Sequence, residues 1–365
     1  MKKALVGLFV LVVLASFTPI FAQATQEMAK PYIAVVSKGE QHDFWQQVKL
    51  GANAAAAKYN VDITFEGPPS ESDVQTQVEM LNNAMAKNPV AIALAALNTS
   101  SVLDQLQEIQ AKGIPVIGFD SGVPEAPKGS IWANAATNNY NAAGMAAKKM
   151  FEVIKPEIEM ATDAKPVKIV VLNQDASGES LLSRGKGFRD TMVDLITTQT
   201  KLTKADIKVM GNTAYIAADS PTMGKKVMIE MVVPASAAMT DATNASQAVL
   251  NKVVSDHILG IFCSNEATVK GLLAATNDGA MLKTDAKYKN VVVIGYDAGA
   301  GQKNAVRKGY FLGSITQDPY SIGYKAVELA YKAYKGESVA DVDTGAKFYD
   351  KSNMDNDDIK GLLYD

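Results

Sequence analysis

The chain has very little cysteine, histidine or tryptophan. Its 365 residues include one cysteine, Cys263, and two histidines, His42 and His257. A single cysteine cannot form an internal disulfide, so the fold must be held by its core. The histidines are far apart and lack metal-ligand spacing, and no histidine is spaced to act as a base for Cys263, which we expect to be an inert thiol. The sequence therefore predicts no metal site and no cysteine nucleophile.

Neither sign of charge is in clear excess. Lysine and arginine number 36 and aspartate and glutamate 39, a formal net charge of −3. This balance offers no electrostatic basis for binding nucleic acid or an anionic membrane surface. Hydrophobic residues make up 47% of the chain, which is ample for burial. The length exceeds what one hydrophobic core usually serves, so we expect two lobes.

Only the first residues form an apolar run that bears on the compartment. Lys2 and Lys3 precede the apolar stretch Ala4–Phe17, and Ala22–Ala24 supplies a small-x-small cleavage pattern. The run is shorter than the roughly 20 residues that span a bilayer, so the pattern predicts a signal peptide over residues 1–24 rather than an uncleaved anchor. No cysteine lies near the cleavage site to carry a lipid. We therefore expect an exported protein without a lipid anchor, located in the periplasm.

The rest of the chain alternates short β-branched runs with amphipathic segments. Val74, Val78, Leu81 and Met85 lie on one face of a predicted helix. Strict alternation of strand and helix predicts parallel sheets covered on both faces. The predicted strands are Tyr32–Ser37, Asp62–Glu66, Ala91–Leu94, Ile114–Phe119, Val167–Leu172, Ile207–Gly211, Ile258–Phe262, Val291–Tyr296 and Gly313–Thr316.

The segment Thr213–Ser246 is harder to interpret because it is rich in methionine and small residues. We predict a helix near Pro221–Met231, then a loop, then a helix near Ala245–Ser255. The acidic tail after Gly345 is expected to form a surface strand and a cap.

Polar and aromatic side chains follow the predicted strand ends. Ligands of open parallel sheets bind beyond the carboxyl ends of the strands. Carboxylates and amides there could bind the hydroxyls of a sugar-like ligand, and aromatic faces could cover its C–H side. Each residue alone has another interpretation, since an aspartate often caps a helix and Phe44 and Trp45 could belong to the core. The candidate ligand-binding residues are Ser37, His42, Phe44, Trp45, Asp120, Ser121, Asn265, Tyr296, Asp297 and Gln317.

Several segments resemble the type I periplasmic sugar-binding family over nearly the whole chain after the signal peptide. The resemblance implies two similar α/β lobes of Rossmann type, joined by three hinge crossings, that close on a ligand between them. It also implies that the protein is not an enzyme. The matching segments are Ile33–Ser37 with Phe44 and Trp45, Gly113–Asp120, Arg184–Phe188, Ser264–Glu266, Val293–Asp297 and Ile315–Pro319.

The resemblance also implies roles for individual residues. Phe44 and Trp45 match the family's stacking pair, and His42 matches a polar contact just before them. Asp120 matches the carboxylate that binds ring hydroxyls, and Tyr296 is expected to form a further aromatic wall. The amide and carboxylate contacts from the second lobe and the hinge fall on Asn265, Asp297 and Gln317.

The chain departs from the ribose-binding members at two arginine positions, which here are Ser121 and Leu182. Without those donors the recognition of hydroxyls must differ. Arg184 matches another arginine of the motif, one expected to organise its loop rather than touch ligand. The segment Val61–Pro68 also looks like the related autoinducer-2 receptors.

These features predict a solute receptor of an ABC importer that binds a monosaccharide or polyol. A membrane permease is the expected partner; no cofactor is expected, and the protein is expected to be a monomer. One alternative is a receptor that presents autoinducer-2 or another signal to a transporter or chemoreceptor. Another is an exported sugar hydrolase, with Asp120 and Asp297 as its carboxylate pair. We expect residues 30–135 with 318–346 to form one lobe, and residues 136–317 with 347–365 the other.

Overall fold

The computed structural model describes residues 29–40 and 42–364. The predicted signal peptide, residues 1–24, lies outside the described residues. From Pro31 onward the chain forms one unit that contains all the elements below.

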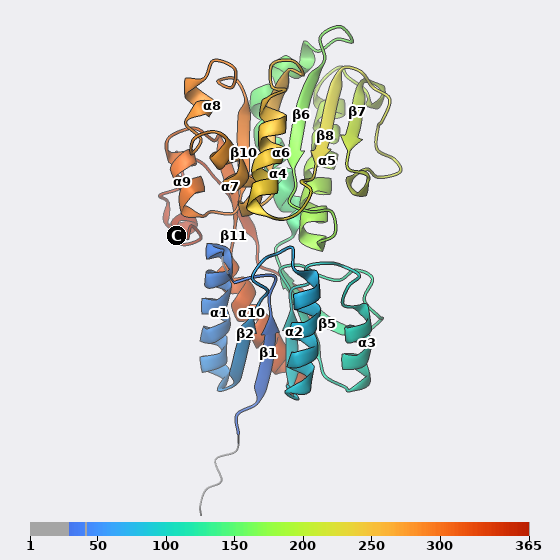
Figure 1. The fold of residues 1–365 in the computed structure, drawn as a ribbon, viewed down its shortest axis with the longest axis vertical. Helices are drawn as coiled ribbons and strands as arrows, with labels where there is room; N and C mark the ends of the chain where they lie inside the picture. Colours follow the sequence, from blue (N-terminus) through green and yellow to red (C-terminus); the bar gives the residue numbers. More distant parts are fainter. Residues whose placement is uncertain (1–28, 41, 365) are drawn as a thin grey trace, which may run out of the picture. The chain divides into compact units, whose positions relative to one another are not determined.

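One sheet has six strands, all parallel, in the order β12-β5-β4-β3-β1-β2. Helices α1 (Asp43–Tyr59) and α10 (Pro319–Tyr334) pack on one face of it, and α2 (Val74–Ala86) and α3 (Leu103–Ala111) on the other (Figure 1). We call this sheet with its helices the six-stranded lobe. Its strands are β1 (Tyr32–Val36), β2 (Asp62–Glu66), β3 (Ala91–Leu94), β4 (Val116–Phe119), β5 (Ile131–Ala136) and β12 (Val342–Asp343).

The other sheet has seven strands in the order β13-β11-β10-β9-β6-β8-β7, and only β13 runs antiparallel to its neighbour. Helices α4 (Asn139–Glu159) and α5 (Glu179–Gln199) cover one face, and α6 (Met239–Leu250), α7 (Glu266–Ala275) and α9 (Ala300–Arg307) the other (Figure 1). This is the seven-stranded lobe. Its remaining elements are β6 (Val167–Leu172), β7 (Ile207–Gly211), β8 (Val227–Val232), β9 (Ile258–Cys263), β10 (Val292–Tyr296), β11 (Gly313–Gln317), β13 (Ala346–Tyr349), α8 (Met281–Thr284) and α11 (Asp357–Lys360).

The chain passes between the two sheets three times. The passages lie between β5 and α4, between β11 and α10, and between β12 and β13. The expected α/β fold with two parallel-sheet lobes and three crossings is thereby confirmed.

Burial on both faces explains why the strands could be recognised from the sequence. In β6, Val167 and Val171 pack under α4 and α5, whereas Val170 and Leu172 pack on the opposite face. A strand buried on both sides has few polar residues and is therefore visible as an uninterrupted apolar run. Four predicted strands have the observed bounds, and the other five differ by one or two residues. The unpredicted β5 contains no β-branched run, because its sequence is Ile-Trp-Ala-Asn-Ala-Ala.

The predicted helix near Pro221–Met231 is wrong. The last residues of that segment, from Val227 onward, belong to β8, which pairs with β6 and β7. Burial alternates along β8, with Val227, Ile229 and Met231 inside, which is the period of a strand rather than a helix. The methionines concealed this alternation. The following helix, α6, begins at Met239 instead of Ala245.

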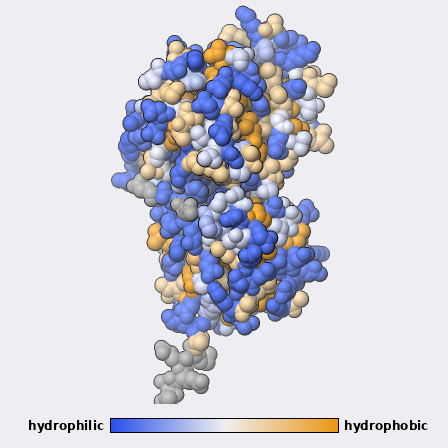
Figure 2. All heavy atoms as spheres, in the orientation of Figure 1, coloured by the Kyte–Doolittle hydropathy of each residue, from blue (hydrophilic) through white to orange (hydrophobic). Residues whose placement is uncertain are grey.

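The face drawn in Figure 2 is mainly hydrophilic, with apolar residues scattered over it. Within residues 29–40 and 42–364, none of the helices is long and apolar enough to cross a membrane.

Candidate functional site

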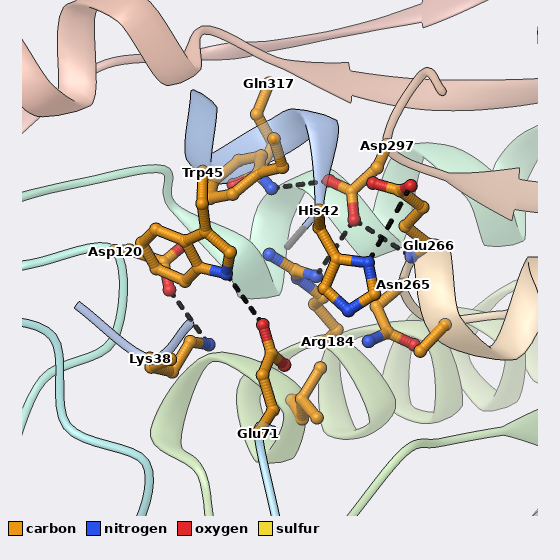
Figure 3. A pocket seen from close by; sticks show the side chains of 13 residues that line it. Lys38, His42, Trp45, Glu71, Asp120, Arg184, Asn265, Glu266, Asp297 and Gln317 are labelled. Atoms are coloured by element: carbon orange, nitrogen blue, oxygen red, sulfur yellow. Dashed lines mark hydrogen bonds and ion pairs between the residues drawn. The ribbon is translucent and has the colours of Figure 1, made fainter. Parts of the chain in front are cut away.

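A cavity lies where the carboxyl ends of strands from both sheets meet. Its lining comes from the loops after β1, β2, β4 and β10, from the end of β11, and from the first turns of α1, α5 and α7. The lining residues are Lys38, His42, Phe44, Trp45, Glu71, Asp120, Leu181, Arg184, Asn265, Glu266, Ala267, Asp297 and Gln317 (Figure 3).

The two lobes each contribute an aspartate in an unusual backbone conformation. Asp120 follows β4 with φ of 55°, and Asp297 follows β10 with φ of 76°. Positive φ is disfavoured for residues other than glycine, and such strain is concentrated at functional sites. At both positions the sharp turn directs the carboxylate into the cavity, where both are almost fully buried.

Asp297 is held by groups of its own lobe. Gln317 Nε2 donates to Asp297 Oδ1 at 2.7 Å, and the backbone N–H of Glu266 donates to Oδ2 at 3.0 Å. Arg184 Nη1 lies 3.9 Å from Oδ2. Burial raises the pKa of Asp297, although the charge of Arg184 and the two hydrogen bonds act in the opposite direction. The carboxylate is therefore oriented by groups of the protein itself.

Asp120 is paired with a lysine. Lys38 Nζ lies 2.9 Å from Asp120 Oδ2 and donates to Ser180 Oγ of the seven-stranded lobe at 3.2 Å. Burial alone would lower the pKa of Lys38, but the charges of Asp120 and Glu71 outweigh it and raise the pKa. Lys38 is therefore a cation that contacts both lobes.

An aromatic wall closes one side of the cavity. The rings of Phe44 and Trp45 meet edge to face at 5.0 Å, and Trp45 meets Phe119 edge to face at 6.3 Å. Trp45 is only 2% exposed, so its orientation is set by packing. Its indole Nε1 donates to Glu71 Oε1 at 2.7 Å (Figure 3). The wall is rigid, and its one polar atom is already satisfied.

Arg184 lines the cavity, whereas the sequence led us to expect it in a purely structural role. Its guanidinium carbon lies 3.9 Å from the centre of the Tyr296 ring. Its Nε donates to Asn139 Oδ1 at 2.7 Å, and its Nη1 donates to the Ser264 carbonyl at 3.1 Å. These contacts hold the guanidinium beside Asp297, so Arg184 both organises its surroundings and faces the site.

The start of α7 carries a second polar group of the site. Asn265 caps this helix, with its Oδ1 accepting from the N–H of Thr268 at 3.1 Å. Its Nδ2 is thereby left to donate, and it does so to Gln174 Oε1. Glu266 forms an ion pair with Lys270 and lies 4.0 Å from His42 Nδ1. Burial raises the pKa of Glu266, against the opposing charge of Lys270.

Seven of the ten candidate residues line this one cavity, and three do not. Tyr296 is buried beneath Arg184, with its hydroxyl 3.0 Å from Asn139 Oδ1, so it is a support rather than a wall. Ser37 Oγ donates to the Gly39 carbonyl at 2.8 Å, which stabilises the loop after β1. Ser121 Oγ accepts from the N–H of Ser180 at 3.4 Å. The seven lining residues are His42, Phe44, Trp45, Asp120, Asn265, Asp297 and Gln317.

Sequence reasoning missed six lining residues. Lys38 and Glu266 directly follow residues that were noticed, so extending each strand end by one position would have found them. Glu71 lies in the loop between β2 and α2, where no motif marks it. The others are Leu181, Arg184 and Ala267.

The chemistry of the lining suits a neutral ligand rich in hydroxyl groups. Lys38 and Arg184 each oppose an aspartate, and Glu266 is matched by Lys270. The fourth carboxylate, Glu71, accepts hydrogen bonds from Trp45 and Gln174, so neither Lys38 nor Arg184 is left unopposed for an anionic ligand. Donors and acceptors surround an aromatic wall, as hydroxyl recognition requires. Within the described part of the chain, no group of three or more histidine, cysteine or acidic residues could hold a metal ion. Cys263 is buried, and burial raises the pKa of its thiol, so a reactive thiolate is disfavoured.

Comparison with known proteins identifies the class to which this fold and site belong. The model of the family described as "Periplasmic binding protein domain" matches residues 33–338. The chain therefore belongs to the periplasmic binding protein type I family, whose members are non-catalytic solute-binding proteins.

Individual relatives cover nearly all of the chain. A solved structure from Brachyspira murdochii, titled "ABC transporter, LacI family transcriptional regulator", is 39% identical with a TM-score of 0.75, covering 92% of this chain and 99% of that one. The structure of an ABC transporter solute-binding protein from Agrobacterium vitis with bound D-fucose is 29% identical with a TM-score of 0.71. The match covers 91% of this chain and 100% of that one. The D-allose-binding periplasmic protein of Escherichia coli (strain K12) is 22% identical, covering 89% of this chain and 91% of that protein.

Proposed function

We propose that this protein captures a neutral monosaccharide or a closely related polyol between its lobes and delivers it to the permease of an ABC importer. The observation that carries the proposal is the convergence of Asp120 and Asp297 on one cavity. They come from matching strand ends of the two sheets, and both adopt positive φ. Ligand groups bound to both carboxylates would hold the lobes together.

The relatives support this assignment. One is named for D-allose, and another was solved with D-fucose. The lining carries four carboxylates, those of Glu71, Asp120, Glu266 and Asp297, against the cations Lys38 and Arg184. It therefore favours an uncharged sugar over a sugar phosphate or a sugar acid, whose negative charge would lack a partner in the buried site.

Binding would act by shifting a population of open and closed forms. A ligand that contacts both lobes only in the closed form stabilises that form by its differential affinity. We propose that the moving bodies are residues 30–135 with 318–346 and residues 136–317 with 347–365. The three passages between the sheets support this division.

The compartment and the partners belong to the same proposal. We propose export by a signal peptide over residues 1–24, a periplasmic location without a lipid anchor, and a monomer that docks on the permease. The periplasmic homologues support the location.

The test is a thermal-shift screen of the chain without residues 1–24, followed by titration calorimetry. The panel holds D-allose, D-fucose, D-ribose, D-arabinose, several polyols and autoinducer-2. A ligand at 100 times its Kd stabilises the folded state by about 2.7 kcal/mol, which raises Tm by a few degrees. A rise with one sugar supports the proposal. A rise with autoinducer-2 alone supports the signal-receptor alternative, and no rise with any sugar overturns the sugar assignment.

A further inference from the structure

Glu71 makes two hydrogen bonds that reach in different directions. It lies in the loop between β2 and α2 of the six-stranded lobe and lines the cavity. Its Oε1 accepts from Trp45 Nε1 at 2.7 Å, within the same lobe. Its Oε2 accepts from Gln174 Nε2 at 2.8 Å. Gln174 follows β6 in the other lobe and is 2% exposed. Glu71 is therefore shared between the aromatic wall and the opposite lobe.

The hydrogen-bond chain continues to a second cavity residue and has a fixed direction. Asn265 Oδ1 is used by the Thr268 N–H, so its Nδ2 must donate, and Gln174 Oε1 accepts from it. Gln174 must then turn its own NH₂ group towards Glu71. The indole of Trp45 can only donate. Two donors consequently converge on position 71, one from each lobe.

Only an ionised carboxylate fits that position well. A carboxylate accepts at both oxygens, whereas an amide offers one acceptor and one donor group. Burial alone would raise the pKa of Glu71, but the charge of Lys38 and the hydrogen bonds from Trp45 and Gln174 outweigh it and lower the pKa. Figure 3 shows Glu71 between the Trp45 indole and the lower side of the cavity, outside the Asp297 network.

We propose that Glu71 is a positioning residue that links closure of the lobes to the placement of two ligand contacts, Trp45 and Asn265. This inference rests on the proposed function, and it takes as ligand contacts these two candidate residues that line the cavity. When the lobes close, Gln174 reaches Glu71; this hydrogen bond orients the Asn265 amide while the other oxygen of Glu71 holds the indole. Glu71 acts through these neighbours. Its contribution to ligand binding is lost when the residue at position 71 cannot accept two hydrogen bonds.

The first variant is Glu71→Gln, which keeps the size of the side chain. The side chains at positions 71, 174 and 265 are then all amides. No rotation of these amides gives every donor an acceptor, because Asn265 and Trp45 still donate at the two ends of the series of hydrogen bonds. We expect at least a tenfold loss of affinity for the D-allose or D-fucose that binds the wild type. We also expect a larger radius of gyration without sugar in small-angle X-ray scattering, because a contact of the closed form is lost.

The decisive control is the exchange Glu71→Gln with Gln174→Glu. Gln at position 71 can accept from Trp45 and donate to Glu at position 174, whose other oxygen accepts from Asn265. Every hydrogen bond is restored with the same atoms. The affinity for the sugar should therefore return to within about threefold of the wild-type affinity, and the radius of gyration should return to the wild-type value. Gln174→Glu alone places two carboxylates together and should be at least as harmful as Glu71→Gln.

A spectroscopic readout separates this role from simple stabilisation. The chain has two tryptophans, so Trp132→Phe leaves Trp45 as the only one. In that background Glu71→Gln should shift the emission maximum of Trp45 and the exchange should restore it. If Glu71→Gln does not fold, Gln174→Met, which removes the donor from the other lobe, must enlarge the radius of gyration without sugar.

The outcomes for the two proposals differ. If no sugar binds the wild type, the proposed function fails, but scattering and emission without sugar still test Glu71. An equal radius of gyration in wild type, Glu71→Gln and the exchange overturns the inference. So does an exchange that binds no better than Glu71→Gln while the wild type binds sugar.

Discussion

Asp120 and Asp297 occupy matching positions in the two lobes, yet they are held by different kinds of partner. Asp297 is bound by Gln317 and by the N–H of Glu266, both reached through the seven-stranded lobe. Asp120 faces Lys38, whose other contact, Ser180, lies across the cavity. The seven-stranded lobe thus has a preformed half-site, whereas the half-site of the six-stranded lobe is completed by contact with its partner lobe.

The outer helix pairs show a second contrast. In both lobes two helices pack through glycines. A Cβ on Gly51 or Gly323 would lie 1.9 Å from a backbone carbonyl of the facing helix, α10 or α1. Between α4 and α5, a Cβ on Gly187 would likewise strike the backbone carbonyl of Tyr140, but one on Gly144 would meet the Thr191 hydroxyl at 2.8 Å. A side chain can rotate away and a carbonyl cannot, so Gly144 is the most tolerant of these four glycine positions.

The largest expected effect concerns the contact between α1 and α10. Gly323→Ala should lower the free energy of unfolding by about 3 kcal/mol, because α1 and α10 must move apart. Gly144→Ala should cost about 1 kcal/mol or less, since Thr191 can turn and alanine favours helix. Gly301→Ala in α9, with its nearest neighbour at 3.4 Å, is the matched control and should be neutral or stabilising. Urea unfolding measures all three, and equal costs would remove the contrast.

The next effect concerns the two aspartates. Asp297→Ala should cost at least about 2 kcal/mol of sugar binding, about 30-fold in Kd, because it leaves buried donors unpaired. Asp120→Ala should cost less, since Lys38 keeps Ser180 and the nearby charge of Glu71. Titration calorimetry with the sugar found in the screen compares them. Unchanged affinity in Asp297→Ala would remove that residue from the site.

A third prediction concerns Glu328 on α10, which ties that helix to α1. Burial would raise its pKa, but hydrogen bonds from Lys325, Tyr59 and Lys332 lower it to about 2 from an ordinary 4.5. A lowered carboxyl pKa stabilises the folded state above the ordinary value, and this stability is lost as the pH falls from 4.5 towards 2. Glu328→Gln should therefore cost about 2 kcal/mol at pH 7.

Denaturant unfolding of wild type and Glu328→Gln across this range is the check. The difference between them should shrink below pH 4.5 and be nearly gone at pH 2. A difference that does not change with pH would mean that the loss comes from packing rather than from the ionised pair.

The smallest effect concerns Tyr296. Tyr296→Phe removes the hydroxyl near Asn139 but keeps the ring beneath Arg184, so sugar affinity should change less than about threefold. Tyr296→Leu removes the ring and should weaken binding further, because Arg184 loses its support. A large loss in Tyr296→Phe would mean that the hydroxyl contacts ligand directly.

Most of the strand positions could be predicted because two-sided burial leaves a strong local signal. Val167–Leu172 is apolar throughout and was placed correctly. β8 was missed because methionine, which favours helices, stands at both a buried and a half-buried position and conceals the alternation of a strand. β5 was missed because alanine carries no strong preference for strand.

Candidate site residues were found where the topology itself points to them. Asp120 and Asp297 end strands of a parallel sheet, and such ends gather at one edge. Glu71 could not be found this way, since its role depends on Gln174 and Trp45, which are remote in the sequence. Tyr296 was assigned to the wall because a strand end alone does not say which neighbour will cover the ring.

The sequence by itself determined the alternation of strands and helices, the two-lobed fold and the strand ends that carry polar groups. These follow from local periodicity and from the rule that parallel strands are connected through helices. Only the tertiary structure decided how the charges are paired: Lys38 with Asp120, Arg184 beside Asp297, and Glu71 between two donors. Such pairings depend on distances between segments that are remote in the sequence or in different lobes, and no local pattern encodes them.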